Sequence, residues 1–165
     1  MFCKGSGYAG DSVMTIVVAA WSAEVTHNHP EGIKGAEATA SAIFLARKHT
    51  PKEEIRAYIV REFDYDLSRT CDEIRPEYHH VESCQKTVPE ALTAFMEGND
   101  FEDVIRTAVS LGGDCDTLTC IAGSIAEAFY GVPEWMIEEC RKREEKDMLE
   151  VVERFEKAVG KERVK

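Results

Sequence analysis

The chain has 165 residues, of which 44% are apolar and 31% are charged. This composition lies in the ordinary globular range and excludes collagen-like, low-complexity and largely disordered proteins. Because the length is typical of a single domain, we predict one domain over residues 1–165. The 31 Asp and Glu residues outnumber the 20 Lys and Arg residues, and the formal net charge of −11 would repel the phosphate backbone of a nucleic acid.

Neither the apolar runs nor the cysteines indicate a membrane protein or a secreted one. The apolar run over residues 13–21 is too short to span a bilayer. A signal peptide is the alternative for this run, but Asp11 abuts it and the lone Lys4 makes a poor basic region. The six cysteines show no C-x-x-C spacing, so we expect reduced thiols and not a structural zinc site. We therefore expect a cytoplasmic protein with no membrane partner and no nucleic-acid partner.

Helical periodicity dominates the chain and predicts an all-α fold. The first of these predicted helices covers the alanine-rich residues 35–47. The next one follows Thr50, Pro51 and Glu53, which form a capping-box pattern with proline at the first helical position. An apolar stripe that ends with Phe63 predicts that this helix packs one face into a core.

The middle of the chain contains a predicted loop and two further helices. The periodicity fails over residues 64–86, which predicts a long loop with a short helix around residues 67–74. Two capping-box patterns then mark helix starts, at Thr87 with Glu90 and at Asn99 with Glu102. We expect these two helices to end near residues 96 and 110.

Two helices are predicted for the last third of the chain. The first runs over about residues 117–130, before Gly131 and Pro133 interrupt it. The charged stretch over residues 138–157 keeps one face apolar, which predicts a terminal helix packed on the surface and ending near Gly160.

The segment over residues 111–118 is the most informative one in the sequence. Gly112 and Gly113 release the backbone just before an apolar helix begins, and Asp114, Asp116 and Thr117 then crowd one turn. Carboxylates at a helix start can be simple capping residues that the helix dipole favours. Capping needs one acid, however, whereas two carboxylates and a hydroxyl together supply the hard oxygen ligands that Mg²⁺ or Mn²⁺ prefers.

Further segments extend this pattern. Residues 112–117 (Gly-Gly-Asp-Cys-Asp-Thr) precede residues 121–126 (Ile-Ala-Gly-Ser-Ile-Ala) and 129–133 (Phe-Tyr-Gly-Val-Pro). Together they resemble the C-terminal signature of the ADP-ribosylglycohydrolase family. Residues 26–36 (Thr-His-Asn-His-Pro-Glu-Gly-Ile-Lys-Gly-Ala) and the helix over 40–46 resemble the histidine-bearing loop and following helix of small bacterial members.

The resemblance continues from residue 21 to about residue 155, and it implies a compact all-α fold with a binuclear Mg²⁺ or Mn²⁺ centre. Such a protein hydrolyses the N- or O-glycosidic bond between ADP-ribose and an acceptor, so the implied partner is an ADP-ribosylated protein or small molecule. Asp114, Asp116 and Thr117 match the family's C-terminal metal ligands, and the two aspartates are also the implied catalytic residues. His27 matches a substrate-binding position.

The first part of the metal centre departs from the family pattern. A Thr-Asp-Asp run is expected before an apolar helix, but this chain has Ala9, Gly10 and Asp11 there. Asp11 is the one expected ligand of that run, and we predict that it completes a depleted site with weaker affinity for divalent ions.

The chain also passes directly from residues 17–20 to Trp21, where family members carry a long segment. It therefore resembles a shortened or internally deleted member, with residues 1–20 as a remnant of the N-terminal metal-binding helix and residues 21–159 as the C-terminal part. Helices that face the lost segment would expose apolar surface, so we expect a homodimer, for example one that exchanges the helix over residues 13–20.

Two alternatives accompany the interpretation as a metal-dependent hydrolase. Ala9 and Gly10 favour a catalytically impaired remnant that binds ADP-ribose, a nucleotide or a partner chain without turnover. An acidic helical interaction protein without a ligand would leave residues 112–117 unexplained. For His27 and His29 a zinc site is the alternative, but no third ligand stands in obvious register.

Overall fold

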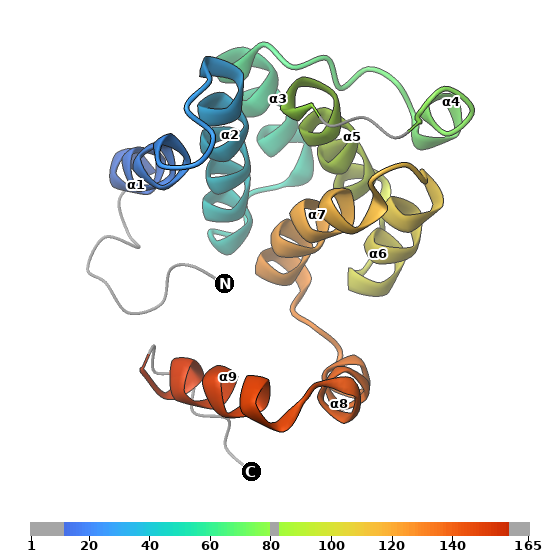
Figure 1. The fold of residues 1–165 in the computed structure, drawn as a ribbon. Helices are drawn as coiled ribbons and strands as arrows, with labels where there is room; N and C mark the ends of the chain where they lie inside the picture. The colour runs from blue at the N-terminus through green and yellow to red at the C-terminus, as the bar shows by residue number, and fades with distance from the viewer. Residues whose placement is uncertain (1–11, 80–82, 159–165) are drawn as a thin grey trace.

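The computed structural model describes residues 12–79 and 83–158, and within these ranges it contains nine α-helices and no strand (Figure 1). The prediction of an all-α fold is confirmed. The helices are α1 (Ser12–Glu24), α2 (Pro30–Arg47), α3 (Lys52–Phe63), α4 (Cys71–Ile74), α5 (Cys84–Glu97), α6 (Phe101–Ser110), α7 (Cys115–Tyr130), α8 (Glu134–Arg143) and α9 (Lys146–Ala158).

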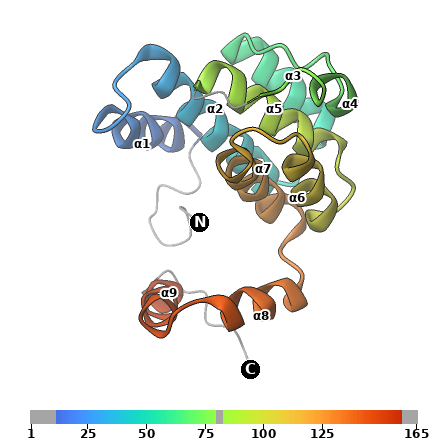
Figure 2. The ribbon, with the colours of Figure 1, turned by 45° about the vertical axis from the view of Figure 1, so that its right-hand side comes forward.

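Helices α2, α5 and α7 form the centre of a bundle, and α1, α3, α4 and α6 pack around them (Figures 1 and 2). Small side chains make the centre compact: Ala38, Ala42 and Ala46 recur every fourth residue along α2 and are fully buried. On α7, Gly123 lies so close to α6 that a Cβ there would sit 2.9 Å from Cδ1 of Ile105. Such a stripe of small residues lets helix axes approach closely.

A lysine joins three helices of the bundle. Lys52, at the start of α3, donates from Nζ to the carbonyls of Phe95 (2.8 Å), Met96 (3.1 Å) and Gly98, where α5 ends. The hydroxyl of Tyr130, at the end of α7, also donates to the Gly98 carbonyl (2.9 Å). These contacts satisfy carbonyls that have no partner inside α5 and place a positive charge at its negative end.

Two of the predicted capping boxes do not form, although the helices that they were predicted to open are present. The capping box of Thr50 and Glu53 does not form, because α3 begins at Lys52 and the Pro51 carbonyl accepts its first hydrogen bonds. Thr87 and Glu90 do not open a helix either, since α5 already begins at Cys84. Both side chains are buried inside α5, 4% and 6% exposed, so tertiary packing extends this helix beyond its local start signal.

The helix predicted after Asn99 is confirmed, but its cap lies one residue later. Asp100 caps α6 by accepting from the amide of Asp103 (2.8 Å), and Asp103 accepts from the amide of Asn99 (2.9 Å). Asp100 and Asp103 therefore replace Asn99 and Glu102 as the capping pair. The predicted helix over residues 117–130 is also confirmed, with its start two residues earlier at Cys115.

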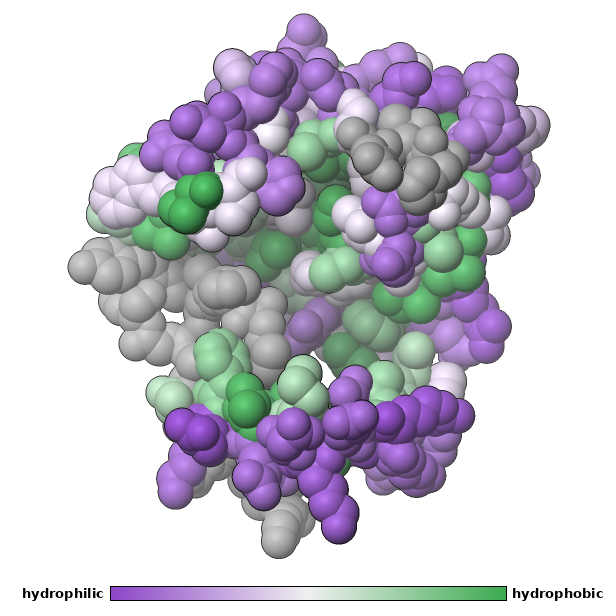
Figure 3. All heavy atoms as spheres, in the orientation of Figure 1, coloured by the Kyte–Doolittle hydropathy of each residue, from purple (hydrophilic) through white to green (hydrophobic). Residues whose placement is uncertain are grey.

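The single terminal helix predicted over residues 138–157 is wrong, because the chain forms α8 and α9 with a break at Glu144 (ψ 147°). This pair lies below the bundle in Figures 1 and 2 and contains no buried residue. Figure 3 shows hydrophobic side chains gathered on the side of the pair that faces the bundle. Trp135, Met148 and Val151 are each half-exposed or more.

No helix among the described residues is both long and apolar enough to cross a membrane.

Candidate functional site

The loop between α6 and α7 has a backbone that favours glycine. Gly112 and Gly113 have φ angles of +74° and +61°, in the left-handed region where a Cβ causes strain. At Gly113 a Cβ would also lie 2.7 Å from the carbonyl oxygen of His79 and 2.8 Å from Cε1 of Tyr78. Two constraints, conformation and close packing, therefore act on Gly113.

The three predicted oxygen donors follow this loop directly. Asp114 occupies the cap position of α7 and makes no side-chain cap hydrogen bond, while its carbonyl accepts from the amide of Leu118 (3.1 Å). The interpretation of Asp114 as a simple capping residue is thus not supported. Asp116 and Thr117 lie in the first turn and are exposed, and Asp114 is partly exposed. Asp114, Asp116 and Thr117 therefore lie within four consecutive residues at the positive end of α7.

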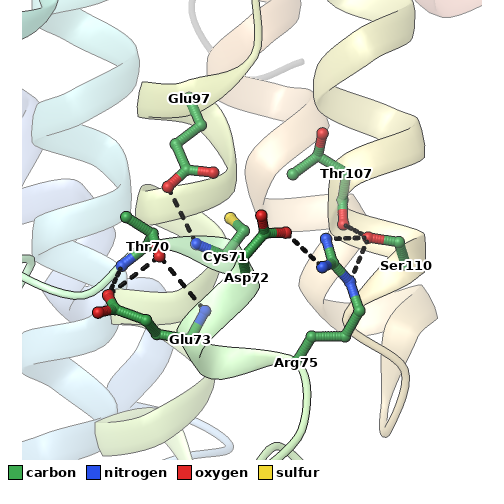
Figure 4. A network of polar contacts seen from close by, with 8 residues as sticks. All are labelled: Thr70, Cys71, Asp72, Glu73, Arg75, Glu97, Thr107 and Ser110. Carbon is green, nitrogen blue, oxygen red and sulfur yellow. Dashed lines mark hydrogen bonds and ion pairs between the residues drawn. The ribbon is translucent and has the colours of Figure 1, made fainter.

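A short helix holds the other side of this loop in place. In α4, Thr70 accepts from the Glu73 amide (3.3 Å), and the Glu73 carboxylate accepts from the Thr70 amide (2.8 Å) (Figure 4). The Glu97 carboxylate at the end of α5 accepts from the Cys71 amide (2.9 Å). The first turn of α4 is therefore fixed to α5, and the chain leads from it to Tyr78 and the contact with Gly113.

Arg75 connects α4 to the end of α6. Its guanidinium donates to Oγ of Ser110 from Nη2 (3.1 Å) and Nε (3.3 Å), and pairs with Asp72 (2.5 Å) (Figure 4). Ser110 stands two residues before Gly112. The sequence could have indicated the cap of α4 from its Thr-x-x-Glu spacing, but Arg75 and Ser110 are 35 residues apart and no local pattern links them.

His27 and His29 have local roles in the described structure. His29 caps α2 by accepting from the Glu31 amide (3.2 Å). His27 is exposed, and its Nδ1 lies 2.8 Å from Oγ1 of Thr26. Its carbonyl oxygen would lie 2.8 Å from a Cβ on Gly32, so the loop folds tightly onto α2. In both Figure 1 and Figure 2 this loop lies to the left of the loop that precedes α7.

The fourth predicted metal ligand, Asp11, lies outside the described residues. Within residues 12–79 and 83–158, no three His, Cys, Asp or Glu side chains form a group that could hold a metal ion. Asp114, Asp116 and Thr117 nevertheless fit Mg²⁺ or Mn²⁺ in kind, because all three are hard oxygen donors on one turn. An octahedral ion needs about six ligands, so these three form part of a site.

Comparison with known proteins decides the family. The profile of the ADP-ribosylglycohydrolase family matches residues 3–164, nearly the whole chain. The chain belongs to the ADP-ribosylglycohydrolase family. A solved structure described as an ADP-ribosylglycohydrolase-related protein complex superposes with a TM-score of 0.60 and 31% identity, covering 75% of this chain and 45% of the other. The predicted family and its helical fold are confirmed.

Several known proteins are similar to the chain in sequence. The ADP-ribosylarginine hydrolase Tri1 of Pseudomonas putida is 32% identical over 126 residues, which is 68% of this chain and 33% of that protein. An uncharacterised protein of Archaeoglobus fulgidus is 33% identical over 138 residues, 74% of this chain and 45% of its own length. Human ADP-ribosylhydrolase ARH3 is 41% identical over 69 residues, 40% of this chain and 18% of its own. The chain thus spans less than half the length of each of these relatives.

Proposed function

We propose that the chain acts as a metal-dependent hydrolase that cleaves the glycosidic bond between ADP-ribose and an acceptor on a protein or small molecule. The observation that carries this proposal is the turn with Asp114, Asp116 and Thr117, set by two left-handed glycines at the start of α7. Membership of the ADP-ribosylglycohydrolase family supports the reaction class.

Asp114, Asp116 and Thr117, with Asp11, would hold Mg²⁺ or Mn²⁺, which supplies Lewis-acid polarisation of the substituent at the anomeric carbon of ribose. The two aspartates also serve as the catalytic carboxylates, whose negative charge stabilises positive charge developing on the sugar ring. Gly113 packs against His79 and Tyr78, so the turn is oriented before substrate arrives and less ordering remains to be done on binding. His27 contacts substrate from the α1–α2 loop.

The acceptor class can be ranked for testing. The similarity to an ADP-ribosylarginine hydrolase over 68% of this chain makes ADP-ribosylated arginine the first substrate to test. ADP-ribose carries two phosphates, and the chain carries a net charge of −11, so divalent cations at the site would reverse an otherwise repulsive field. We therefore expect substrate binding to require the cations.

A calorimetric titration of Mn²⁺ and Mg²⁺, with and without ADP-ribose, tests this proposal. We expect Asp116→Asn to lose most of the ion binding, because a carboxylate ligand becomes a neutral amide. Glu153→Gln removes one negative charge from the exposed face of α9 and is the matched control. Equal ion affinity in all three proteins would contradict the assignment of Asp116, and release of ADP-ribose from an ADP-ribosylated arginine peptide then tests turnover.

A second candidate function is binding without turnover. It is favoured because no three His, Cys, Asp or Glu side chains of the described residues form a group that could hold a metal ion, and because Ala9 and Gly10 replace expected oxygen donors. ADP-ribose binding that depends on Mn²⁺ but releases no product from several acceptor types would select this candidate. Absence of both binding and release would reject both functions.

We also infer a homodimer from exposed apolar side chains at the two ends of the described chain. Val18 and Trp21 on α1 are 46% and 61% exposed, and Val151 and Phe155 on α9 are 56% and 38% exposed. Covering such surface by a second copy would remove it from water. Light scattering after size exclusion tests this inference, and a monomer across the accessible concentrations would contradict it.

A further inference from the structure

A cavity lies away from the predicted metal ligands. It has a volume of about 260 Å³ and opens between the start of α2, the segment after α3 and the first half of α5. Tyr65 and Glu90 line it and are buried, 5% and 6% exposed. None of its lining residues is His27 or one of the donors that follow Gly113.

Polar groups in this cavity have hydrogen-bonding capacity that the described chain leaves unused. The hydroxyl of Tyr65 is buried and has no hydrogen-bond partner among the described residues. Arg69 donates to Oε1 of Glu90 (2.5 Å), one of the two acceptor oxygens of this buried carboxylate. Burial raises the pKa of Glu90 despite this contact. Buried polar groups without partners are costly, and a bound molecule that donates to them would remove that cost.

Some of the charges that line the cavity are already compensated. Arg69 pairs with Glu90 (2.5 Å) and lies 3.7 Å from the Glu77 carboxylate. Lys34 lies 3.7 Å from the Glu31 carboxylate, and its ammonium sits 4.6 Å from the centre of the Tyr65 ring. The charges of Arg69 and Glu90, and of Lys34 and Glu31, therefore offset each other without a ligand.

Three lining charges have no such compensation. Asp64, Asp66 and Lys86 form no ion pair with any residue of the described chain. The Asp66 carboxylate accepts a hydrogen bond from the Ser68 amide (2.9 Å), and Arg69, already paired with Glu90, attracts it electrostatically without forming an ion pair with it. The cavity therefore presents two negative charges and one positive charge to a ligand.

We propose that this cavity binds a free α-amino acid with a basic side chain. Lys86 takes the α-carboxylate, and Asp64 and Asp66 take the α-ammonium and the cationic side chain. This ligand carries two positive charges and one negative charge, the complement of the charges left in the cavity. Its many N–H donors also suit the buried hydroxyl of Tyr65, which has no hydrogen-bond partner among the described residues.

Other classes of ligand fit these observations less well. A phosphate or a nucleotide would bring its negative charges close to Asp64, Asp66 and Glu31. A divalent cation would meet the ammonium of Lys86, and Asp64, Asp66 and Glu90 do not form a group of three potential metal ligands. An apolar ligand would desolvate charged side chains without compensating them.

Calorimetric titration with L-arginine, L-lysine, L-citrulline and agmatine, at low ionic strength and without divalent ions, tests the proposal. Citrulline lacks the side-chain charge and agmatine lacks the α-carboxylate, so each should bind about tenfold more weakly than arginine. The titration does not use the metal site, so its outcome is independent of the proposed hydrolase function. Undetectable arginine binding, or equal binding of arginine, citrulline and agmatine, would overturn the proposal.

Variants test which residue binds each charged group of the ligand. Lys86→Gln should weaken arginine binding about tenfold but should not weaken agmatine binding, because agmatine has no carboxylate and its two positive charges are repelled by Lys86. Asp66→Asn should weaken arginine binding by a similar factor. Lys146→Gln, on exposed α9, is the matched control, and thermal melting confirms that each variant is folded. An equal loss in Lys146→Gln, or tighter binding of inorganic phosphate than of arginine, would overturn the site.

Discussion

The α2, α5 and α7 centre and the α8–α9 pair are both built from helices with an apolar stripe, yet they differ in what covers that stripe. Leu92 and Phe95 of α5 are fully buried, whereas Met148 and Val151 of α9 remain more than half exposed. In the centre, hydrogen bonds join segments that are distant in sequence, such as Lys52 and the end of α5. In the α8–α9 pair, the ion pair of Arg141 with Glu156 (3.2 Å) joins two consecutive helices. The comparison teaches that an amphipathic pattern forms a helix, but burial depends on a partner surface.

Shortening an aromatic side chain in each region gives the largest expected contrast. Phe95→Ala should lower the free energy of unfolding by about 3–5 kcal/mol, because it leaves a cavity in the core. Phe155→Ala in α9, where the ring is 38% exposed in a single chain, should cost less than about 1 kcal/mol at protein concentrations too low for the inferred homodimer to form. Urea denaturation measures both values, and a similar loss for the two variants would show that α9 is buried in solution, as in a homodimer.

The glycine loop before α7 should respond more strongly than the glycine after it. Gly113→Ala should destabilise by about 2–3 kcal/mol, because its φ of +61° and the His79 carbonyl both oppose a Cβ. Gly131→Ala meets open space, but its φ of +78° with a ψ of 166° is a conformation that essentially only glycine adopts, so about 1–2 kcal/mol is expected.

Mn²⁺ affinity sharpens the same comparison of glycines. Gly113→Ala should weaken Mn²⁺ binding, because the altered loop leads directly into Asp114, whereas Gly131→Ala should leave it unchanged. Equal Mn²⁺ affinities of the two variants would show that Mn²⁺ binding does not depend on the conformation of the loop before α7.

Lys52, which donates to the carbonyls at the end of α5, should contribute more to stability than a lysine of the α8–α9 pair. Lys52→Met should cost about 1–2 kcal/mol, because the carbonyls of Phe95 and Met96 lose a charged donor. Burial lowers the pKa of Lys52, so part of its gain from these contacts is offset by desolvation. Lys146→Met, at the start of exposed α9, should change the free energy of unfolding by less than about 0.5 kcal/mol. Thermal denaturation of the two variants distinguishes these values.

The smallest expected effect is the pH dependence of the α4 cap. Hydrogen bonds from the amide and hydroxyl of Thr70 hold the pKa of Glu73 below its ordinary value. Because the folded-state pKa is lowered, this contribution to stability is present above the ordinary carboxyl pKa and is lost as pH falls through the folded value. In Glu73→Gln, the free energy of unfolding should depend less steeply on pH in this acidic range. Carbon NMR titration of Glu73 should show the lowered pKa directly. An ordinary pKa would contradict the cap.

The sequence determined much of the local structure of this protein. The 3.6-residue periodicity predicted the helices of the bundle, and the glycines before Asp114 predicted the turn that opens α7. The segments around residues 26–36 and 112–117 also identified the family. These features depend on residues within a few positions of one another, where propensity and turn chemistry act directly.

The tertiary structure alone decided which of these local signals prevail. Thr87 and Glu90 have the spacing of a capping box, but burial against neighbouring helices places them inside α5. Arg75 meets Ser110 across 35 residues, and the cavity lined by Tyr65 and Lys86 joins three separate segments. Such contacts depend on how helices pack, because distant side chains meet only after the apolar faces of the bundle have been buried.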